Sequence, residues 1–349
     1  MVAKSVFWER APAKDDYQLN REISLFLGSA STLARIFSPE EIDTSVLKDK
    51  VIASIGYGFQ GRRYSMSIKN HGFRLIVGNI RDKYYDQAVA DGMEVYSIEE
   101  AAKRADIVMM LTGDEAQPKI YRESIQNRLR DGGALVFASG FNIYYGFIQP
   151  PKQYDLLLVA PVTPTVMGVG VENDVSGKAW PIALALCKVG RTPFHLAVES
   201  TFAEEVVTDE FHAAADVSIS CQLAMFDLLV EAGYSPEMAY FNTIGWITAN
   251  VEEAFQKRGS EGLEKAFSMT SNTSHYDKFV YAQTLLDKRF KDKMRRILRK
   301  IEDGEVAKEW MLEDSLGRPV LNRRMKRFLE HPALVLERTM LAKRTKAKV

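Results

Sequence analysis

The stretch that decides the fold is "VIASIGYGFQG", residues 51–61. A short apolar run leads into three glycines with the spacing G-x-G-x-x-G. In such a loop the first glycine permits a tight turn, the second lets the backbone approach a pyrophosphate, and the third lets a helix pack closely on the strand. The N-terminus of that helix then faces the phosphates. The stretch predicts a dinucleotide-binding unit, with a purely structural glycine turn as the alternative. We assign cofactor binding to the whole loop: Gly56, Tyr57, Gly58, Phe59, Gln60 and Gly61.

Similar apolar runs follow at intervals of roughly 20 to 30 residues, and they read "RLIVG", "DIVMMLT", "GALVFAS" and "DLLLVAP". Because each run is short, apolar throughout and bounded by Gly or Asp, the pattern indicates buried parallel strands joined by crossover helices. After about residue 200 the strand pattern fades, and residues 219–232 and 236–257 carry apolar side chains at helical spacing. The sequence therefore predicts an α/β, doubly wound parallel sheet followed by an all-helical region.

We place the nucleotide-binding domain, with an N-terminal extension, at residues 1–200, the helical domain at 201–335, and a basic tail at 336–349. Low-complexity blocks and Gly/Ser linkers are not evident, so we expect the two domains to pack closely.

The composition excludes several classes of protein. The 46 basic and 46 acidic side chains of the 349 residues cancel, so no global field attracts nucleic acid or a membrane surface. Cys187 and Cys221 have no metal-ligand spacing and suggest no disulfide framework. The N-terminal sequence does not resemble a secretory signal, and no 18-residue apolar stretch is apparent. We therefore expect a cytoplasmic protein with a small-molecule substrate and with neither a nucleic-acid nor a membrane partner.

The end of the second apolar run bears on the choice of cofactor. Asn79 follows the run, and Arg81 and Lys83 lie in the next loop. An NAD-preferring site usually carries an acid here for the ribose hydroxyls, whereas cations suit a 2′-phosphate. The sequence therefore favours NADPH over NAD. Two solvated loop charges are the alternative, and Asp82 between them weakens the pattern.

Six motifs in the chain resemble the ketol-acid reductoisomerase family. They are "IGYGFQG", "DEAQPKIY" (114–121), "GFNIYYG" (140–146), "EAGYSPEMAYF" (231–241), "SNTSHY" (271–276) and "GEVAKEWMLEDSLGRP" (304–319). They span about residues 45 to 335 in the family's order. The resemblance implies a Rossmann domain, a knotted all-helical second domain, and NADPH- and magnesium-dependent chemistry in branched-chain amino-acid synthesis. It also implies a homodimer in which helices of both copies complete each site.

The resemblance further implies two magnesium ions held by four carboxylates, in two pairs that are each one helical turn apart. In this chain the first pair falls on Asp209 and Ala213, and the second on Asn242 and Trp246. One carboxylate and one amide are too few oxygen ligands for two such ions. We therefore predict no metal and no magnesium requirement, and a repurposed site rather than a working ketol-acid reductoisomerase or an inactive relic.

Without metals the alkyl shift of the family's reaction should be lost, while hydride transfer from NADPH remains possible. A reduced ketone becomes an alkoxide and needs a cationic or acidic stabiliser, but an iminium can be stabilised by a carboxylate. These arguments predict a metal-independent imine reductase of a specialised biosynthetic pathway, with Asp209 as iminium stabiliser or proton relay. A ketone reductase and a non-catalytic NADPH-binding protein are the alternatives, and a helix N-cap is the alternative role for Asp209.

Other candidate residues come from the same motifs. Two more are assigned to catalysis: Ser271, for which Ser268 or Thr270 could substitute, and Tyr144, which with Tyr145 could equally be a packing residue. Ser139 and Val162 stand where the resemblance implies a histidine and a lysine. Glu205 and Glu210 are close to Asp209 in the sequence but are weaker candidates for the site, and we expect Glu210 to be solvated. Candidate substrate-binding residues are Ser139, Asn242, Trp246 and His212, of which His212 could instead be a plain polar helix residue.

Overall fold

The computed structural model describes residues 34–245 and 271–346. The chain separates into two compact units, Met1–Glu205 (unit 1) and Val206–Val349 (unit 2). The boundary falls within helix α8 (Phe202–Ala215). Each unit is described by itself.

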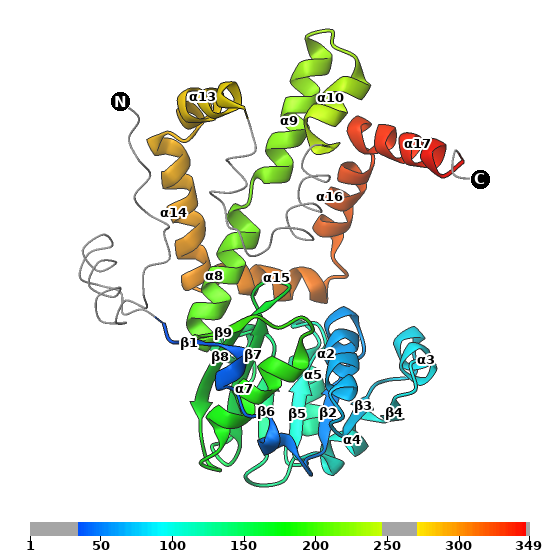
Figure 1. Ribbon diagram of the computed structural model, residues 1–349, viewed down its shortest axis with the longest axis vertical. Coiled ribbons are helices and arrows are strands. Elements are labelled where there is room, and N and C mark those ends of the chain that lie inside the picture. Colours follow the sequence, from blue (N-terminus) through cyan, green and yellow to red (C-terminus); the bar gives the residue numbers. More distant parts are fainter. Residues whose placement is uncertain (1–33, 246–270, 347–349) are drawn as a thin grey trace. The chain divides into compact units, whose positions relative to one another are not determined.

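Unit 1 is built on one sheet, in which the described residues form nine strands in the order β1-β9-β8-β7-β6-β5-β2-β3-β4 (Figure 1). The strands are β1 (Ile36–Phe37), β2 (Ile52–Ile55), β3 (Leu75–Gly78), β4 (Glu94–Tyr96), β5 (Ile107–Met110), β6 (Ala134–Phe137), β7 (Asp155–Pro161), β8 (Val166–Asn173) and β9 (Leu196–Glu199). Strand β2 pairs in parallel with β3 on one side and with β5 on the other. The strand order therefore reverses at β2, which is where ligands bind in open α/β sheets.

Helices cover both faces of this sheet. They are α2 (Phe59–Asn70), α3 (Lys83–Ala90), α4 (Ile98–Arg104), α5 (Gln117–Ile120), α6 (Phe141–Tyr144) and α7 (Ala179–Gly190), with the short helices η1 (Pro39–Glu41), η2 (Ser45–Leu47) and η3 (Tyr121–Ile125). Residues of α2 and α7 form one core cluster with Ile52 and Met109. Residues of α4 form another with Ile55 and Met110. Adjacent strand residues thus point into opposite cores, which explains why the strands read as continuous apolar runs. The predicted α/β class is confirmed.

The sheet is mixed rather than wholly parallel, which corrects the prediction in detail. Strand β8 returns antiparallel to β7, with Val159 opposite Val169, and β1 pairs antiparallel with β9. The connection between β7 and β8 spans only residues 162–165, closed by a hydrogen bond from Val162 N to Val166 O of 3.0 Å. Such a short connection permits a hairpin but no crossover helix.

Unit 2 is helical throughout its described residues, as predicted for the second half. Its elements are α8, α9 (Ser218–Glu231), α10 (Pro236–Asn242), α13 (Asn272–Val280), η4 (Ala282–Leu285), α14 (Lys288–Glu302), α15 (Glu305–Ser315), α16 (Pro319–Leu329) and α17 (Pro332–Lys346). Helix α10 ends at Asn242, where the Thr243 hydroxyl donates back to Ala239 O at 2.7 Å. The helical stretch predicted over 236–257 is interrupted at Thr243, Ile244 and Gly245 are again helical, and its residues from 246 onward lie outside the described part.

The expectation that the chain has no long apolar stretch is wrong. Helices α8 and α9 together span Phe202–Glu231, which is long and apolar enough to cross a membrane by length and composition. The stretch carries seven Asp and Glu side chains in all, but its most apolar 18-residue window has at most two charged residues. One such stretch is weak evidence for a membrane span, because core helices of soluble proteins meet the same criterion.

Candidate functional site

The glycine loop after β2 has the geometry of a phosphate cradle. Gly56 has φ +97°, a left-handed conformation that glycine adopts without strain. A Cβ at Gly61 would lie 2.2 Å from the Gly56 carbonyl oxygen, so helix α2 approaches the loop as closely as a glycine allows. A Cβ at Gly58 would meet nothing within 4 Å. The loop thus leaves open space beside Gly58, at the start of α2, where backbone can approach a pyrophosphate. These residues fit a dinucleotide.

The other three loop residues act in different ways. Tyr57 is buried, and its hydroxyl donates to Asp91 Oδ2 at 2.9 Å. Burial and this bond raise the pKa of Tyr57. Phe59 is 74% exposed, and the Gln60 Oε1 atom accepts a long hydrogen bond of 3.4 Å from Arg191. The side chain of Tyr57 is therefore engaged with the end of α3, and only its backbone is left for the cofactor assignment.

A cavity of about 560 Å³ lies at the ends of β3 and β4, and Asn79 and Arg81 line it together with Tyr85 and Tyr96. The Asn79 amide donates to Asp82 Oδ1 at 2.9 Å. The same oxygen accepts from the backbone of the first turn of α3, so Asp82 is the N-cap of that helix. The acid that weakened the cofactor prediction thus has a structural role.

Lys83 does not line this cavity. It lines a second cavity, between α2 and α3, and its ammonium group lies 4.9 Å from the centroid of the Tyr84 ring. The structure therefore brings Asn79 and Arg81 together and separates Lys83 from them.

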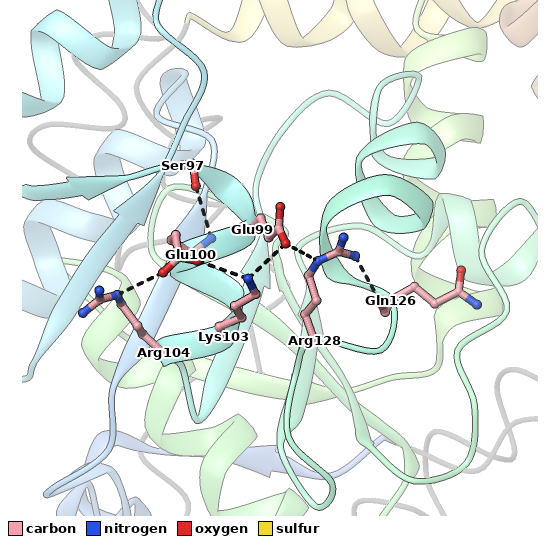
Figure 2. A network of polar contacts seen from close by, with 7 residues as sticks. All are labelled: Ser97, Glu99, Glu100, Lys103, Arg104, Gln126 and Arg128. Atoms are coloured by element: carbon pink, nitrogen blue, oxygen red, sulfur yellow. Dashed lines mark hydrogen bonds and ion pairs between the residues drawn. The ribbon is translucent and has the colours of Figure 1, made fainter.

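A network of ion pairs braces one wall of the cavity that holds Arg81 (Figure 2). Glu99 of α4, which lines the cavity, pairs with Lys103 at 3.0 Å and with Arg128 Nε at 3.0 Å. Arg128 belongs to the segment after η3, so the pair ties that segment to α4. Arg128 and Lys103 lower the pKa of Glu99. Each pair is exposed and individually weak, but together they hold the start of α4 in place.

The loop after β6 is tied to the first turn of α8. Gly140 N donates to Glu205 Oε2 at 2.5 Å, and a Cβ at Gly140 would lie 2.1 Å from Phe202 O. The Ser139 hydroxyl accepts from Phe141 N at 3.2 Å, and Tyr144 ends helix α6. The sequence does not indicate this hydrogen bond of Glu205, since 65 positions separate it from Gly140. Its carboxylate fixes the loop that carries Ser139 and Tyr144.

Asp209 is not a helix N-cap. It is an exposed residue in the middle of α8, and Thr201, directly before the helix, accepts from Glu204 N at 3.0 Å. His212 is exposed one turn further on. Glu210 is half-buried rather than solvated, and burial, followed by the nearby Asp209 charge, raises its pKa. The alternative role of Asp209 as an N-cap is wrong because the helix starts seven residues before it. The expectation that Glu210 is solvated is wrong because its side chain is half-buried.

The four positions that the resemblance assigns to magnesium do not form a suitable donor set. Asp209 and Ala213 lie on α8 as an exposed acid and an exposed methyl group. Asn242 ends α10 and donates its amide to Met238 O at 2.9 Å, and Trp246 lies outside the described residues. Across residues 34–245 and 271–346, no group of three or more His, Cys, Asp or Glu side chains could hold a metal ion. The residues present therefore do not fit a pair of magnesium ions.

Ser271 directly precedes α13 and is exposed. Its possible substitutes Ser268 and Thr270 lie outside the described residues, so their assignments stay predictions. Val162, in place of the implied lysine, is 60% exposed.

Comparisons with known proteins agree with the resemblance. Residues 46–192 match the family described as acetohydroxy acid isomeroreductase, NADPH-binding domain, and residues 202–346 match the ketol-acid reductoisomerase C-terminal domain. The chain is 37% identical over 320 residues to a ketol-acid reductoisomerase (NADP(+)) of Methanocaldococcus jannaschii, covering 86% of this chain and 94% of that protein. It is 36% identical over 317 residues to the enzyme of the same name from Methanopyrus kandleri, covering 86% and 95%.

A solved structure shows the same architecture. An NADH-preferring ketol-acid reductoisomerase from an uncultured archaeon superposes with a TM-score of 0.83 at 31% identity, over 88% of this chain and 98% of that one. The NADP(H)-binding Rossmann domain and the helical second domain are thus confirmed.

These findings overturn two interpretations of the sequence. The imine reductase, with its ketone-reductase and non-catalytic alternatives, is wrong, because the full-length relatives are ketol-acid reductoisomerases. The exclusion of a working ketol-acid reductoisomerase is contradicted by the same relatives. Both errors came from giving four metal positions more weight than the rest of the chain. Because both of its domains match the family and the similarity covers most of its length, the chain belongs to the ketol-acid reductoisomerase family.

Proposed function

We propose that the chain is an NADP(H)-dependent oxidoreductase of the ketol-acid reductoisomerase type. The observation that carries the proposal is near full-length similarity to relatives named for this activity. The open cradle at Gly58 supports it, because dinucleotide chemistry needs backbone close to the phosphates. The same relatives favour cytoplasmic biosynthesis as its setting and a small ketol acid as its substrate.

Several residues of the chain support binding of the cofactor. The Gly56–Gly61 loop presents the backbone at the start of α2 to the pyrophosphate, and Arg81 offers a cation at the ribose end. When bound, the reduced nicotinamide supplies the hydride. We propose that NADPH is preferred over NADH because the Asp82 carboxylate caps the N-terminus of α3 and therefore does not bind the ribose hydroxyls.

The activity is tested by following NADPH oxidation with acetolactate in the presence of magnesium. We expect oxidation that depends on acetolactate. If Asp209 serves the reaction, Asp209→Asn should lower kcat/KM by about tenfold or more without changing the affinity for NADPH. Glu231→Gln, which removes an exposed acid at the end of α9, is the control. If NADPH binds but no ketol acid is reduced, the proposed function is wrong.

We further propose that Asp209, Ala213, Asn242 and Trp246 do not hold a pair of magnesium ions in this chain. Calorimetric titration with Mg²⁺ should find fewer than two ions bound per chain. Ala213→Glu places a second carboxylate one turn after Asp209 and should strengthen binding. Ala214→Glu adds the same charge about 140° around the helix from Asp209 and should not. Uptake of two ions by the unaltered chain would contradict this part and leave the proposed activity standing.

We also infer a homodimer. Little of the apolar stretch Phe202–Glu231 is buried, only 6% of its most apolar window. It carries exposed apolar side chains, among them Met225 and Leu228. Exposed apolar surface of this extent marks an interaction face.

A further inference from the structure

A cavity of about 490 Å³ is lined by residues of β1, η1, α7 and β9, at one margin of the sheet of unit 1 (Figure 1). The strand order places β3 and β4, which carry the ribose end of the cofactor site, at the opposite end of the sheet. The volume is within the range of small-molecule sites. We propose that this cavity binds an α-amino acid with an apolar side chain. The proposal is independent of the proposed function, because the lining includes no residue assigned to the cofactor or the reaction.

The buried side of the cavity is apolar and suits the side chain of such a ligand. Phe37 and Ile42 are each 4% exposed and belong to a core cluster of unit 1, and Trp180 and Leu184 pack against that cluster. All four line the cavity, and the Phe37 and Trp180 ring centroids lie 6.3 Å apart. An apolar group placed on this surface leaves water, which favours binding.

Three carboxylates line the same cavity, those of Glu41, Asp43 and Glu199. Glu41 Oε2 accepts from Ser38 N at 2.7 Å, and this bond is the main cause of the lowered pKa of Glu41. The Ser45 hydroxyl, 2.7 Å from Asp43 Oδ2, lowers the pKa of Asp43. The Glu199 carboxylate has neither a hydrogen bond nor an ion pair within the described part of the chain. The three negative charges favour a ligand with an ammonium group.

One cation in the lining adds a second requirement. The exposed Arg35 guanidinium lies 4.4 Å from the centroid of the Phe37 ring, and its charge also acts on Glu41. A guanidinium binds a carboxylate through two parallel hydrogen bonds. An ammonium group, a carboxylate and an apolar side chain together match every part of the lining. An α-amino acid combines these three groups.

Hydrogen bonds hold the walls of the cavity in place. Lys188 of α7 donates through Nζ to Pro39 O at 2.7 Å and to Ile42 O at 3.0 Å, which ties η1 to α7. Glu199 N donates to Arg35 O at 2.8 Å, so the acid and the cation lie on neighbouring, paired segments of the sheet margin. A preorganised site loses little freedom when a ligand binds.

The experiment is a thermal titration of the full chain with L-leucine, with and without saturating NADP⁺. A ligand that binds only the folded chain raises its melting temperature. We expect a saturable rise that NADP⁺ does not remove. Three analogues each lack one part of leucine: 3-methylbutylamine lacks the carboxylate, 4-methylpentanoate the ammonium group, and glycine the side chain. Each should bind at least about tenfold more weakly than leucine.

Variants assign the effect to the cavity. Glu199→Gln and Arg35→Gln should each weaken leucine by about tenfold, because each removes one charge that pairs with the ligand. Glu172→Gln and Arg122→Gln, at exposed residues outside the cavity, are the matched controls and should bind leucine as the unaltered chain does. Neither Glu199 nor Arg35 belongs to the core, so both variants should fold, and each is compared with its own melting temperature without ligand.

Several results would overturn the proposal. One is the absence of a saturable response, and another is equal leucine binding in the unaltered chain, Glu199→Gln and Arg35→Gln. A third is binding of 3-methylbutylamine or 4-methylpentanoate as tight as that of leucine, which would make the ligand a simple cation or anion. A fourth is displacement of leucine by NADP⁺ or acetolactate, which would place it in the site already described. A leucine response without reduction of acetolactate would instead contradict the proposed function alone.

Discussion

Gly58 and Gly61 meet different demands within one loop. Gly61 is needed for packing, because a side chain there would collide with the Gly56 carbonyl at 2.2 Å. Gly58 faces open space and has φ −68°, which any residue can adopt. The fold therefore does not require glycine at position 58. The missing side chain instead leaves room for the phosphate of a bound dinucleotide.

Paired substitutions separate these roles. Gly61→Ala should lower the free energy of unfolding by about 1–3 kcal/mol, the usual cost of overpacking. Gly58→Ala should leave stability unchanged and weaken NADP(H) by about tenfold, because its methyl group occupies the space of a phosphate. Urea unfolding and fluorescence titration of NADPH measure the two effects. Normal cofactor affinity in Gly58→Ala would remove this backbone from the site.

Single residues also show where sequence reasoning reaches its limit. The spacing of the glycines was sufficient to locate the nucleotide loop, since it reports a local turn. The bond between Glu205 and Gly140 has no such signal, because it joins distant parts of the chain. Tyr57 was assigned with its loop, but its side chain contacts Asp91, a partner that only the fold brings near.

At the scale of elements, the start of α3 connects helix capping to cofactor choice. Asp82 accepts from both Tyr84 N and Tyr85 N, at 2.9 and 3.0 Å, and also holds the Asn79 amide. One side chain thus fixes both the helix and the residue that follows β3.

Substitutions at Asp82 test this connection. Asp82→Ala should cost about 1 kcal/mol of unfolding free energy through loss of the cap. Asp82→Asn keeps a good cap but removes a negative charge beside Arg81, so the preference for NADPH over NADH should rise about 2- to 5-fold. The ratio of the two cofactor affinities is the measurement. An unchanged ratio in Asp82→Asn would show that the charge of this loop does not select the cofactor.

The elements differ in how far the sequence predicts them. The strands β2, β3, β5, β6 and β7 are buried on both faces, so they appear as apolar runs and were predicted. Strand β4 is only three residues long and has an exposed Glu94, and β8 contains two glycines, so neither gives that pattern. Strand direction depends on the length of the connection after β7, which the apolar pattern does not encode.

At the scale of the whole molecule, the exposed apolar length of α8 and α9 is the basis for the inferred dimer. Sedimentation should give twice the chain mass of 39.4 kDa. Leu228→Asp, at a side chain 64% exposed, should shift the protein toward monomer, because a charge in an apolar interface is costly. Val89→Asp, at an exposed valine of α3 in unit 1, is the matched control. A monomer at all concentrations in the unaltered chain would contradict the inference.

The pairing of β1 with β9 has a consequence for self-association. Ile36 and Phe37 cover the last strand of the sheet and pair with Val198 and Ala197. Strands left open at a sheet margin act as templates for other chains. Loss of these two residues would leave β9 free to recruit a foreign strand, so this brief pairing near the start of the described chain protects the nucleotide-binding unit against aggregation.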